Sequence, residues 1–372
     1  MSSKSIATLS FIILFFLISS IVYPCTTFVL HQGKNIVFGR NLDWITGSGF
    51  IMTNPRNINK RALVDSSEKA IEWSSKYGSM TFNQIGRELP YGGINETGLV
   101  VEHMTLEQTQ YPTKDDRYAI SANQWIQFQL DNYSTIEEVI NSDTFLRIVD
   151  ATSKYHFLIC DKSGNVATIE FLDGKMVSHI QSSLPLPVLA NSTYRSSFEC
   201  YQTKGNTDAN RSLYNFSTAA HKIQENKMLS DESIVNDAFD ILKSVSQGLS
   251  TKWSIVYDVT NMRIYFKIFE TPIIAGEQKI FTKQPGQAEM KFIDFKNFDF
   301  NCSENIKVLN LNENLSGAVD NKFSNYSSQL NKEYISEAFT FFTNWGFSLD
   351  ITPEQIENLA NYPESFTCIK EE

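Results

Sequence analysis

The sequence has few of the side chains that usually bind metal ions. Only 5 of its 372 residues are histidine, and each of them occurs singly. No two cysteines are spaced as a C-x-x-C pair, the pattern typical of zinc sites. We therefore expect no metal centre in this protein.

An excess of positive charge is also missing. The chain has 32 Lys and Arg against 42 Asp and Glu, which gives a formal net charge of -10. Nucleic acids and anionic membrane surfaces attract proteins that carry a basic face. The composition therefore argues against both as partners.

Long hydrophobic runs are absent except at the N-terminus. Residues 1–24 contain one basic residue, Lys4, followed by the apolar segment FIILFFLI at 11–18 and then by Ser19 and Ser20. This order is typical of a secretory signal peptide, and the apolar segment is short for a membrane-spanning helix. We therefore predict that residues 1–24 are a leader removed on maturation and that the protein is secreted or periplasmic.

The cleavage point of this leader is left open by the sequence. Pro24 is a poor residue directly before a signal-peptidase site, so an uncleaved N-terminal anchor is one alternative. Cleavage a little earlier, for example after Val22, would leave two residues in front of Cys25. A lipid anchor on Cys25 is a further alternative, although such processing requires a small residue directly before the cysteine.

The cysteines are too few and too scattered for a disulfide framework. There are 5, at positions 25, 160, 200, 302 and 368. If the last four form two disulfides, Cys25 is the one left unpaired, and three pairings of those four are open. Four free, buried thiols are an equally open alternative.

Strand and helix signals alternate along the chain. Segments rich in Val, Ile, Phe and Thr predict a strand at 97–106 and hairpins at 26–44, 155–180 and 253–269. Amphipathic or capped segments predict helices at 121–133, after Thr135, and at 231–246. Antiparallel hairpins interleaved with helices favour an α+β fold over a parallel sheet.

No linker divides residues 25–372, so we predict a single domain. Its last part, from about residue 300 to 372, is rich in Asn and then has helical periodicity. We expect this part to form a helical extension packed on the core.

Cys25 would become the first residue once the leader is removed. A cysteine in that position has a free α-amino group within reach of its own thiol. The α-amine has a reference pKa of about 7.7 to 8.0, so it can accept the thiol proton and later protonate a leaving amine. The leader would then both export the protein and mask the nucleophile.

The segment FGRNLDW supplies two charged candidates on the strand predicted to pair beside Cys25. Arg40 would favour the thiolate, and Asp43 would hold the ammonium group. The two residues are three apart, so a regular strand would place their side chains on opposite faces. Both reach Cys25 only if the strand ends or bends near Asn41.

Five blocks of the sequence, in this order, resemble the choloylglycine hydrolase family. They extend from Cys25 to about Phe269 and read CTTFVL, FGRNLDW, GGINETGLVVEHM, VLANSTY and TKWSIVYDVTNMRIYF. The family comprises N-terminal nucleophile hydrolases of linear amides, including bile salt hydrolases and penicillin V acylases. The resemblance implies a four-layer αββα sandwich without metal or cofactor, and a homo-oligomer whose assembly the C-terminal extension could block.

The resemblance also implies roles for individual residues. Cys25 matches the nucleophile of the family, and Arg40 and Asp43 match the arginine and aspartate that flank it. Asn191 matches the asparagine that helps to bind the oxyanion.

Two positions depart from the family pattern. Thr105 stands where bile salt hydrolases have a second asparagine, so an oxyanion contact there would fall to a backbone N–H or a hydroxyl. Lys252 lies where relatives often have another arginine, and it would act as a point charge because it lacks the guanidinium fork.

The sequence therefore predicts an exported, self-processed cysteine amidase. It would hydrolyse the linear, non-peptide C–N bond of an N-acylated small molecule through a thioester. Four large side chains, Met52, Phe82, Tyr91 and Trp125, are candidates for lining an acyl pocket. The alternative, motivated by the two departures, is a secreted or lipid-anchored small-molecule binding protein with the same fold and no turnover.

Overall fold

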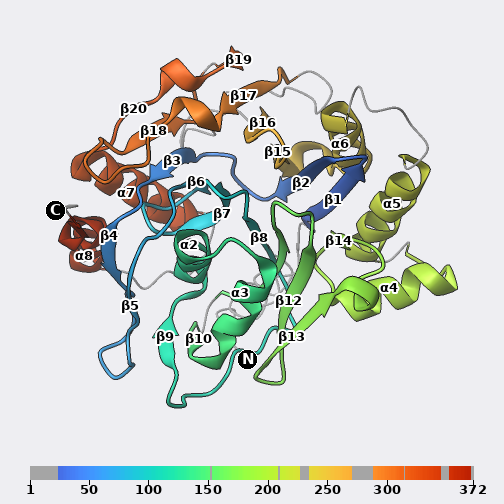
Figure 1. The fold of residues 1–372 in the computed structure, drawn as a ribbon, viewed down its shortest axis with the longest axis horizontal. Helices are drawn as coiled ribbons and strands as arrows, with labels where there is room; N and C mark the ends of the chain where they lie inside the picture. The colour runs from blue at the N-terminus through green and yellow to red at the C-terminus, as the bar shows by residue number, and fades with distance from the viewer. Residues whose placement is uncertain are drawn as a thin grey trace, which may run out of the picture.

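Two β-sheets, antiparallel in their central strands, lie face to face in the computed structural model of the protein (Figure 1). The structure describes residues 24–150, 153–207, 210–226, 234–269, 288–313, 315–344 and 352–369. Most of the predicted leader, residues 1–23, lies outside the described residues.

The strands of the two sheets come from distant parts of the sequence. One sheet has the order β14 (Val188–Leu189), β1 (Thr26–Gln32), β2 (Asn35–Asp43), β15 (Thr251–Asp258), β16 (Arg263–Ile268), β17 (Lys291–Asp294) and β19 (Gly317–Ala318). The other has the order β13 (Lys175–Ile180), β12 (Val166–Leu172), β11 (Tyr155–Cys160), β8 (Val100–Thr105), β7 (Pro90–Asn95), β6 (Ser79–Asn83), β3 (Phe50–Asn54), β18 (Lys307–Asn310) and β20 (Ser324–Asn325). Two small sheets pair β9 (Tyr118–Ile120) with β10 (Leu146–Ile148), and β4 (Ile58–Arg61) with β5 (Glu72–Ser74) and β21 (Thr367–Cys368).

Helices cover the outer faces of both large sheets. On the first sheet, α5 (Arg211–Asn226) and α6 (Ile234–Ser244) pack against β1 and β2, and α4 (Tyr194–Thr203) packs on α5. On the second sheet, α2 (Ala122–Asn132) packs against β7 and β8, and α3 (Ile136–Asn141) lies near β12 (Figure 1). This arrangement confirms the predicted α+β fold and the αββα layering.

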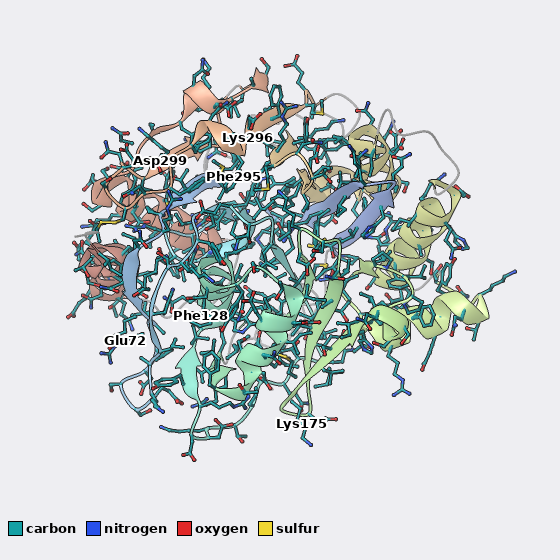
Figure 2. The ribbon with its side chains drawn as sticks, in the orientation of Figure 1. Glu72, Phe128, Lys175, Phe295, Lys296 and Asp299 are labelled. Carbon is teal, nitrogen blue, oxygen red and sulfur yellow. A yellow bond between two sulfur atoms is a disulfide. The ribbon has the colours of Figure 1, made fainter. Side chains whose placement is uncertain are left out.

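Apolar side chains fill the space between the layers. Phe82 of β6 contacts Trp253 and Tyr257 of β15, with ring centroids 5.8 and 6.2 Å apart, so these rings join the two sheets. A second core lies under α2, where Phe128 points inward while Lys175 is exposed at the tip of the β12–β13 hairpin (Figure 2). Burial of such aromatic side chains is the main favourable term in folding.

The β1–β2 hairpin is buried on both faces over most of its length. Strands with two buried faces need near-continuous apolar sequence, as in TTFVL and IVFG. Gly33 makes the turn with a positive φ of 59°, which glycine adopts without strain. Gly39 stands opposite Phe28, where a Cβ atom would lie only 2.5 Å from the Phe28 ring, so the position has no room for a side chain.

The other sequence-based elements are also present. The hairpins at 155–180 and 253–269, the strand within 97–106 and the helix within 121–133 are confirmed. Thr135 caps α3 through a capping box with Glu138. The predicted helix at 231–246 is confirmed as α6 from residue 234, and residues 231–233 lie outside the described residues.

The C-terminal extension contains strands as well as helices. The two predicted helices are present as α7 (Ser328–Asn344) and α8 (Pro353–Asn361), at the left edge of the view (Figure 1). Between the core and these helices, β18 pairs with β3 and extends the nine-stranded sheet. The extension is therefore partly built into the sandwich.

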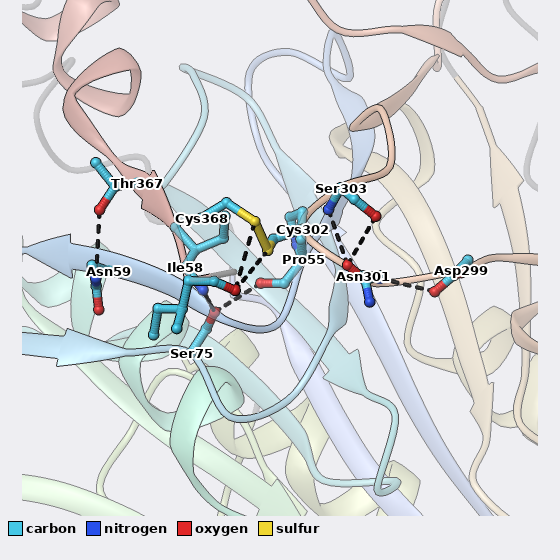
Figure 3. The surroundings of a disulfide bond; sticks show 11 residues. Pro55, Ile58, Asn59, Ser75, Asp299, Asn301, Cys302, Ser303, Thr367 and Cys368 are labelled. Carbon is cyan, nitrogen blue, oxygen red and sulfur yellow. Dashed lines mark hydrogen bonds between the residues drawn. A yellow bond between two sulfur atoms is a disulfide. The ribbon is translucent and has the colours of Figure 1, made fainter. Parts of the chain in front are cut away.

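A disulfide between Cys302 and Cys368 ties the end of the chain to the core (Figure 3). Beside it, Thr367 and Cys368 form β21 and pair with β4. Cys25, Cys160 and Cys200 are free, so neither of the two alternatives from the sequence, two disulfides or four free thiols, was correct. Within the described residues, no helix is both long enough and apolar enough to cross a bilayer.

Replacing both Cys302 and Cys368 with serine is expected to destabilise the protein. For cysteines 66 residues apart, the loss of loop-closure constraint on the unfolded chain corresponds to about 4 kcal/mol of unfolding free energy. Urea denaturation measures this loss, and Cys200→Ser, which removes a free cysteine, is the matched control. A double variant as stable as the control would contradict the expectation.

Candidate active site

Cys25 lies directly before β1, where the end of β2 passes beside it. The register of the hairpin pairs Thr26 with Asn41, which brings Cys25 next to the last residues of β2. The Cys25 thiol donates a weak hydrogen bond to the backbone oxygen of Asp43, with Sγ and O 3.8 Å apart. The thiol is almost fully buried, at 6% exposure.

Both charged residues of the FGRNLDW segment act on this thiol. Arg40 lowers the pKa of Cys25 and Asp43 raises it, so both side chains lie close to the sulfur. In a regular strand, Arg40 and Asp43 would point to opposite faces. The pairing of β2 with the neighbouring strand β15 is irregular at this point. There the register with β2 shifts between Thr251 and Trp253, and Asp43 comes to lie opposite Thr251. On β2 the break therefore falls between Leu42 and Asp43, one residue beyond Asn41, close to the position that the sequence required.

Arg40 is held by a buried ion pair with Glu102 of β8. The second carboxylate oxygen of Glu102 accepts a hydrogen bond from the Tyr257 hydroxyl at 2.5 Å. Arg40 Nη1 also donates to the backbone oxygen of Tyr91 at 3.3 Å. Burial raises the pKa of the Glu102 carboxyl, and Arg40 and Tyr257 oppose this shift.

The sequence argument missed Glu102, although a signal for it was present. The residue stands within GLVVEHM, a mostly apolar segment that was predicted to form a strand. An acidic residue in such a strand is rarely buried without a partner. A search for that partner would have led to Arg40.

Burial raises the pKa of the Cys25 thiol to about 11, with Arg40 opposing and Asp43 assisting the shift. This value refers to the chain with Pro24 still attached. In that state the thiol is protonated at neutral pH. Nucleophilic attack then requires a base that removes the proton.

The Asp43 carboxyl is completely buried, and burial raises its pKa to about 7. Hydrogen bonds from Thr251 and Gln247 and the charges of Arg211 and Arg40 oppose the rise. The carboxyl therefore changes its protonation state near neutral pH, which suits a group that exchanges protons with its neighbours.

Asn191 and Thr105 form a hydrogen bond that the sequence did not predict. Asn191 Nδ2 donates to the backbone oxygen of Thr105 at 2.7 Å. Thr105 thus contributes a carbonyl acceptor, where the sequence suggested a backbone N–H or a hydroxyl donor. The bond fixes the Asn191 amide and leaves its second N–H hydrogen to point elsewhere.

Lys252 lies in the irregular part of β15, next to Thr251, and is largely buried. Its backbone oxygen accepts a hydrogen bond from Phe269 N at 3.0 Å.

The four residues proposed from the sequence to line an acyl pocket do not form one group. Phe82 and Tyr91 share a core with Cys25, whereas Trp125 lies in the core under α2 and Met52 in a third cluster.

Among the described residues, no three His, Cys, Asp or Glu side chains come together as metal ligands. The chemistry that the site offers is that of a thiol, two carboxyl groups, a guanidinium and carboxamide donors. This set suits acyl transfer to sulfur.

Comparison with known proteins identifies the family. Residues 25–209 match the family model described as linear amide C–N hydrolases, choloylglycine hydrolase family. The chain belongs to this family. It is therefore a hydrolase of linear amide C–N bonds, as the resemblance implied.

Individual members of the choloylglycine hydrolase family are similar over most of their length. The chain is 26% identical over 308 residues to penicillin V acylase of Pectobacterium atrosepticum, covering 69% of this chain and 81% of that protein. The structure of penicillin V acylase from Agrobacterium tumefaciens matches with a TM-score of 0.67 and 24% identity, over 82% of this chain and 98% of that one. A conjugated bile acid hydrolase from Clostridium perfringens matches with a TM-score of 0.60 and 17% identity, over 78% and 98%. At these identities the two solved structures demonstrate the shared fold.

The buried Asp43 carboxyl predicts a pH-dependent stability in the chain that retains Pro24. Below pH 4 the carboxyl is protonated in both the folded and the unfolded state. Between pH 4 and 7 it ionises only in the unfolded state, so stability falls as pH rises. The fall is roughly 4 kcal/mol for a shift of about three pKa units.

Urea denaturation at several pH values measures this effect. We compare Cys25→Ala, which keeps the leader junction intact, with Cys25→Ala/Asp43→Asn, which lacks the titrating group. As pH rises from 4 to 7, the unfolding free energy of Cys25→Ala should fall relative to that of Cys25→Ala/Asp43→Asn. A difference that is constant over this range would show that Asp43 is not a raised, buried acid.

Proposed function

We propose that this hydrolase is an exported cysteine amidase that uses Cys25, freed at the N-terminus, as its nucleophile. Its substrate would be a small N-acylated molecule with a linear amide bond. The observation that carries the proposal is the position of the Cys25 thiol at the start of the family match, under the opposing influence of Arg40 and Asp43.

The first half of the reaction forms a thioester. The free α-amine of Cys25 takes the thiol proton, and the thiolate attacks the amide carbonyl carbon of the substrate. Asn191 donates its second N–H hydrogen to the oxyanion that develops there. The ammonium group then protonates the leaving amine, and the C–N bond breaks.

The second half releases the acyl group. A water molecule gives a proton to the same α-amine and attacks the thioester carbon. The C–S bond breaks, and the ammonium group returns the proton to the departing sulfur. Asp43 accepts a hydrogen bond from the ammonium form and keeps it oriented. Arg40, with its charge shared between Glu102 and the sulfur, favours the thiolate.

Export is part of the proposal. It is supported by the leader-like composition of residues 1–24, which the family match leaves out. It is also supported by the Cys302–Cys368 disulfide, because such bonds persist mainly in oxidising compartments. We propose a secreted or periplasmic protein, without a membrane association after leader removal and compatible with a homo-oligomer.

The sequence also left open a binding protein without turnover. Membership in a family of linear amide C–N hydrolases argues against this alternative. The hydrogen bond of Asn191 to the Thr105 carbonyl occupies only one of the two hydrogens of the amide, so the other is left for an oxyanion.

Hydrolysis of penicillin V and of conjugated bile acids by the mature protein tests the proposal, because relatives are named for these substrates. Cys25→Ala is expected to abolish turnover because it removes the nucleophile. Asn191→Ala is expected to lower kcat by about 10²- to 10³-fold, the usual effect of one oxyanion donor, with a smaller change in KM.

The matched control is Cys200→Ser, a free cysteine on α4, which should retain full activity. Full activity of Cys25→Ala would rule out the cysteine mechanism. Tight binding of these or other N-acyl amides by correctly processed wild-type protein, without hydrolysis, would contradict the amidase proposal.

A further inference from the structure

The carbonyl oxygen of Pro24, the last residue before Cys25, is held by two side-chain amides. Asn215 Nδ2 donates to it at 3.1 Å and Gln247 Nε2 at 2.7 Å. Asn215 is completely buried on α5, and Gln247 follows α6. Donors that are 191 and 223 residues away in the sequence thus converge on one carbonyl oxygen.

This carbonyl belongs to the peptide bond that must break to free the amine of Cys25. Pro24 is removed on maturation, so two hydrogen bonds to its carbonyl oxygen cannot stabilise the mature protein. Two amide donors aimed at the oxygen of a scissile carbonyl have the form of an oxyanion hole. The thiol of Cys25 can reach the carbon of this carbonyl through a five-membered ring within its own residue.

The family resemblance already implies that the chain processes itself. We propose that Asn215 and Gln247 are the oxyanion donors for the cut at the Pro24–Cys25 bond. The inference rests on the proposed role of Cys25 as nucleophile. It assigns to self-processing a pair of donors that is separate from Asn191, the donor proposed for the substrate.

The cut proceeds in two balanced steps. The Cys25 sulfur attacks the Pro24 carbonyl carbon, the C–N bond breaks, and the proton lost by the thiol is transferred to the departing nitrogen. The product is a thioester between Pro24 and Cys25 with a free α-amine. Water then attacks the thioester, the C–S bond breaks, and the leader departs with a C-terminal carboxylate on Pro24.

Gln247 connects this carbonyl with the proton-exchanging group of the site. Its backbone N–H donates to Thr251 Oγ1 at 2.8 Å, and Thr251 donates to the Asp43 carboxyl. Asp43 therefore lies beside both the thiol that loses a proton and the bond whose nitrogen gains one. This position suits the proton transfer in the first step.

The two sets of donors come from different elements of the fold. Asn215 and Gln247 belong to the helical layer on the seven-stranded sheet. Asn191 is bonded to Thr105, at the end of β8 in the nine-stranded sheet. Processing and substrate turnover can therefore be separated by mutation.

The test uses the full chain, residues 1–372, synthesised in a membrane-free translation extract that contains no signal peptidase. Intact mass over time reports loss of the leader at Pro24–Cys25. Asn215→Leu and Gln247→Met remove the donors at similar volume, and each is expected to slow the cut by about 10²-fold. Gln224→Met, which removes an exposed amide on α5, should process at the wild-type rate.

Hydroxylamine distinguishes a chemical role from a folding defect. It captures a thioester as a hydroxamate on the released leader, which wild type should yield. Asn215→Leu and Gln247→Met should yield far less, while the Tm of their uncut chains matches that of uncut Cys25→Ala. Wild-type processing rates in both variants, or an equal slowing in Gln224→Met, would overturn the assignment.

The outcomes also separate this inference from the proposed function. A wild-type chain that stays uncut in the extract, but hydrolyses amides after its leader is removed by other means, would overturn self-processing and leave the amidase. A chain that cuts itself and hydrolyses no amide would leave self-processing and overturn the amidase.

Discussion

The buried ion pair between Arg40 and Glu102 is the interaction on which the site depends. It joins β2 of one sheet to β8 of the other, so it links the two halves of the sandwich at the level of Cys25. A buried guanidinium is costly unless it is paired, and loss of one partner typically costs about 3 to 5 kcal/mol. Glu102 and Tyr257 therefore allow a full positive charge beside the thiol in a nearly dry core.

The same burial explains why leader removal changes the chemistry of the site. With Pro24 attached, the nitrogen of Cys25 is an amide without basicity, the thiol is protonated, and the Asp43 carboxyl titrates near pH 7. The cut turns this nitrogen into an amine and places an ammonium group close to Asp43. A nearby positive charge lowers the pKa of a buried carboxyl. Asp43 then becomes an ionised acceptor for the ammonium group.

How much of this was predictable from sequence depends on the distance between the residues that interact. The β1–β2 hairpin and the Thr135 cap follow from neighbouring residues, and the sequence predicted both. The bend that brings Arg40 and Asp43 to one cysteine was required by the argument, but its cause lies 208 residues away in β15. The Glu102 pair and the Pro24 donors arise only when the sheets and helices pack, so no local pattern encodes them.

Two carbonyl sites around one sulfur also impose an order on events. While Pro24 is attached, the nitrogen of Cys25 is part of a peptide bond, and no free amine is available to serve a substrate. Turnover of an external amide can begin only after the internal bond has been cut. Separate donors for the two reactions let each be positioned for its own carbonyl. Efficient processing therefore does not require the geometry around Asn191 to fit the leader.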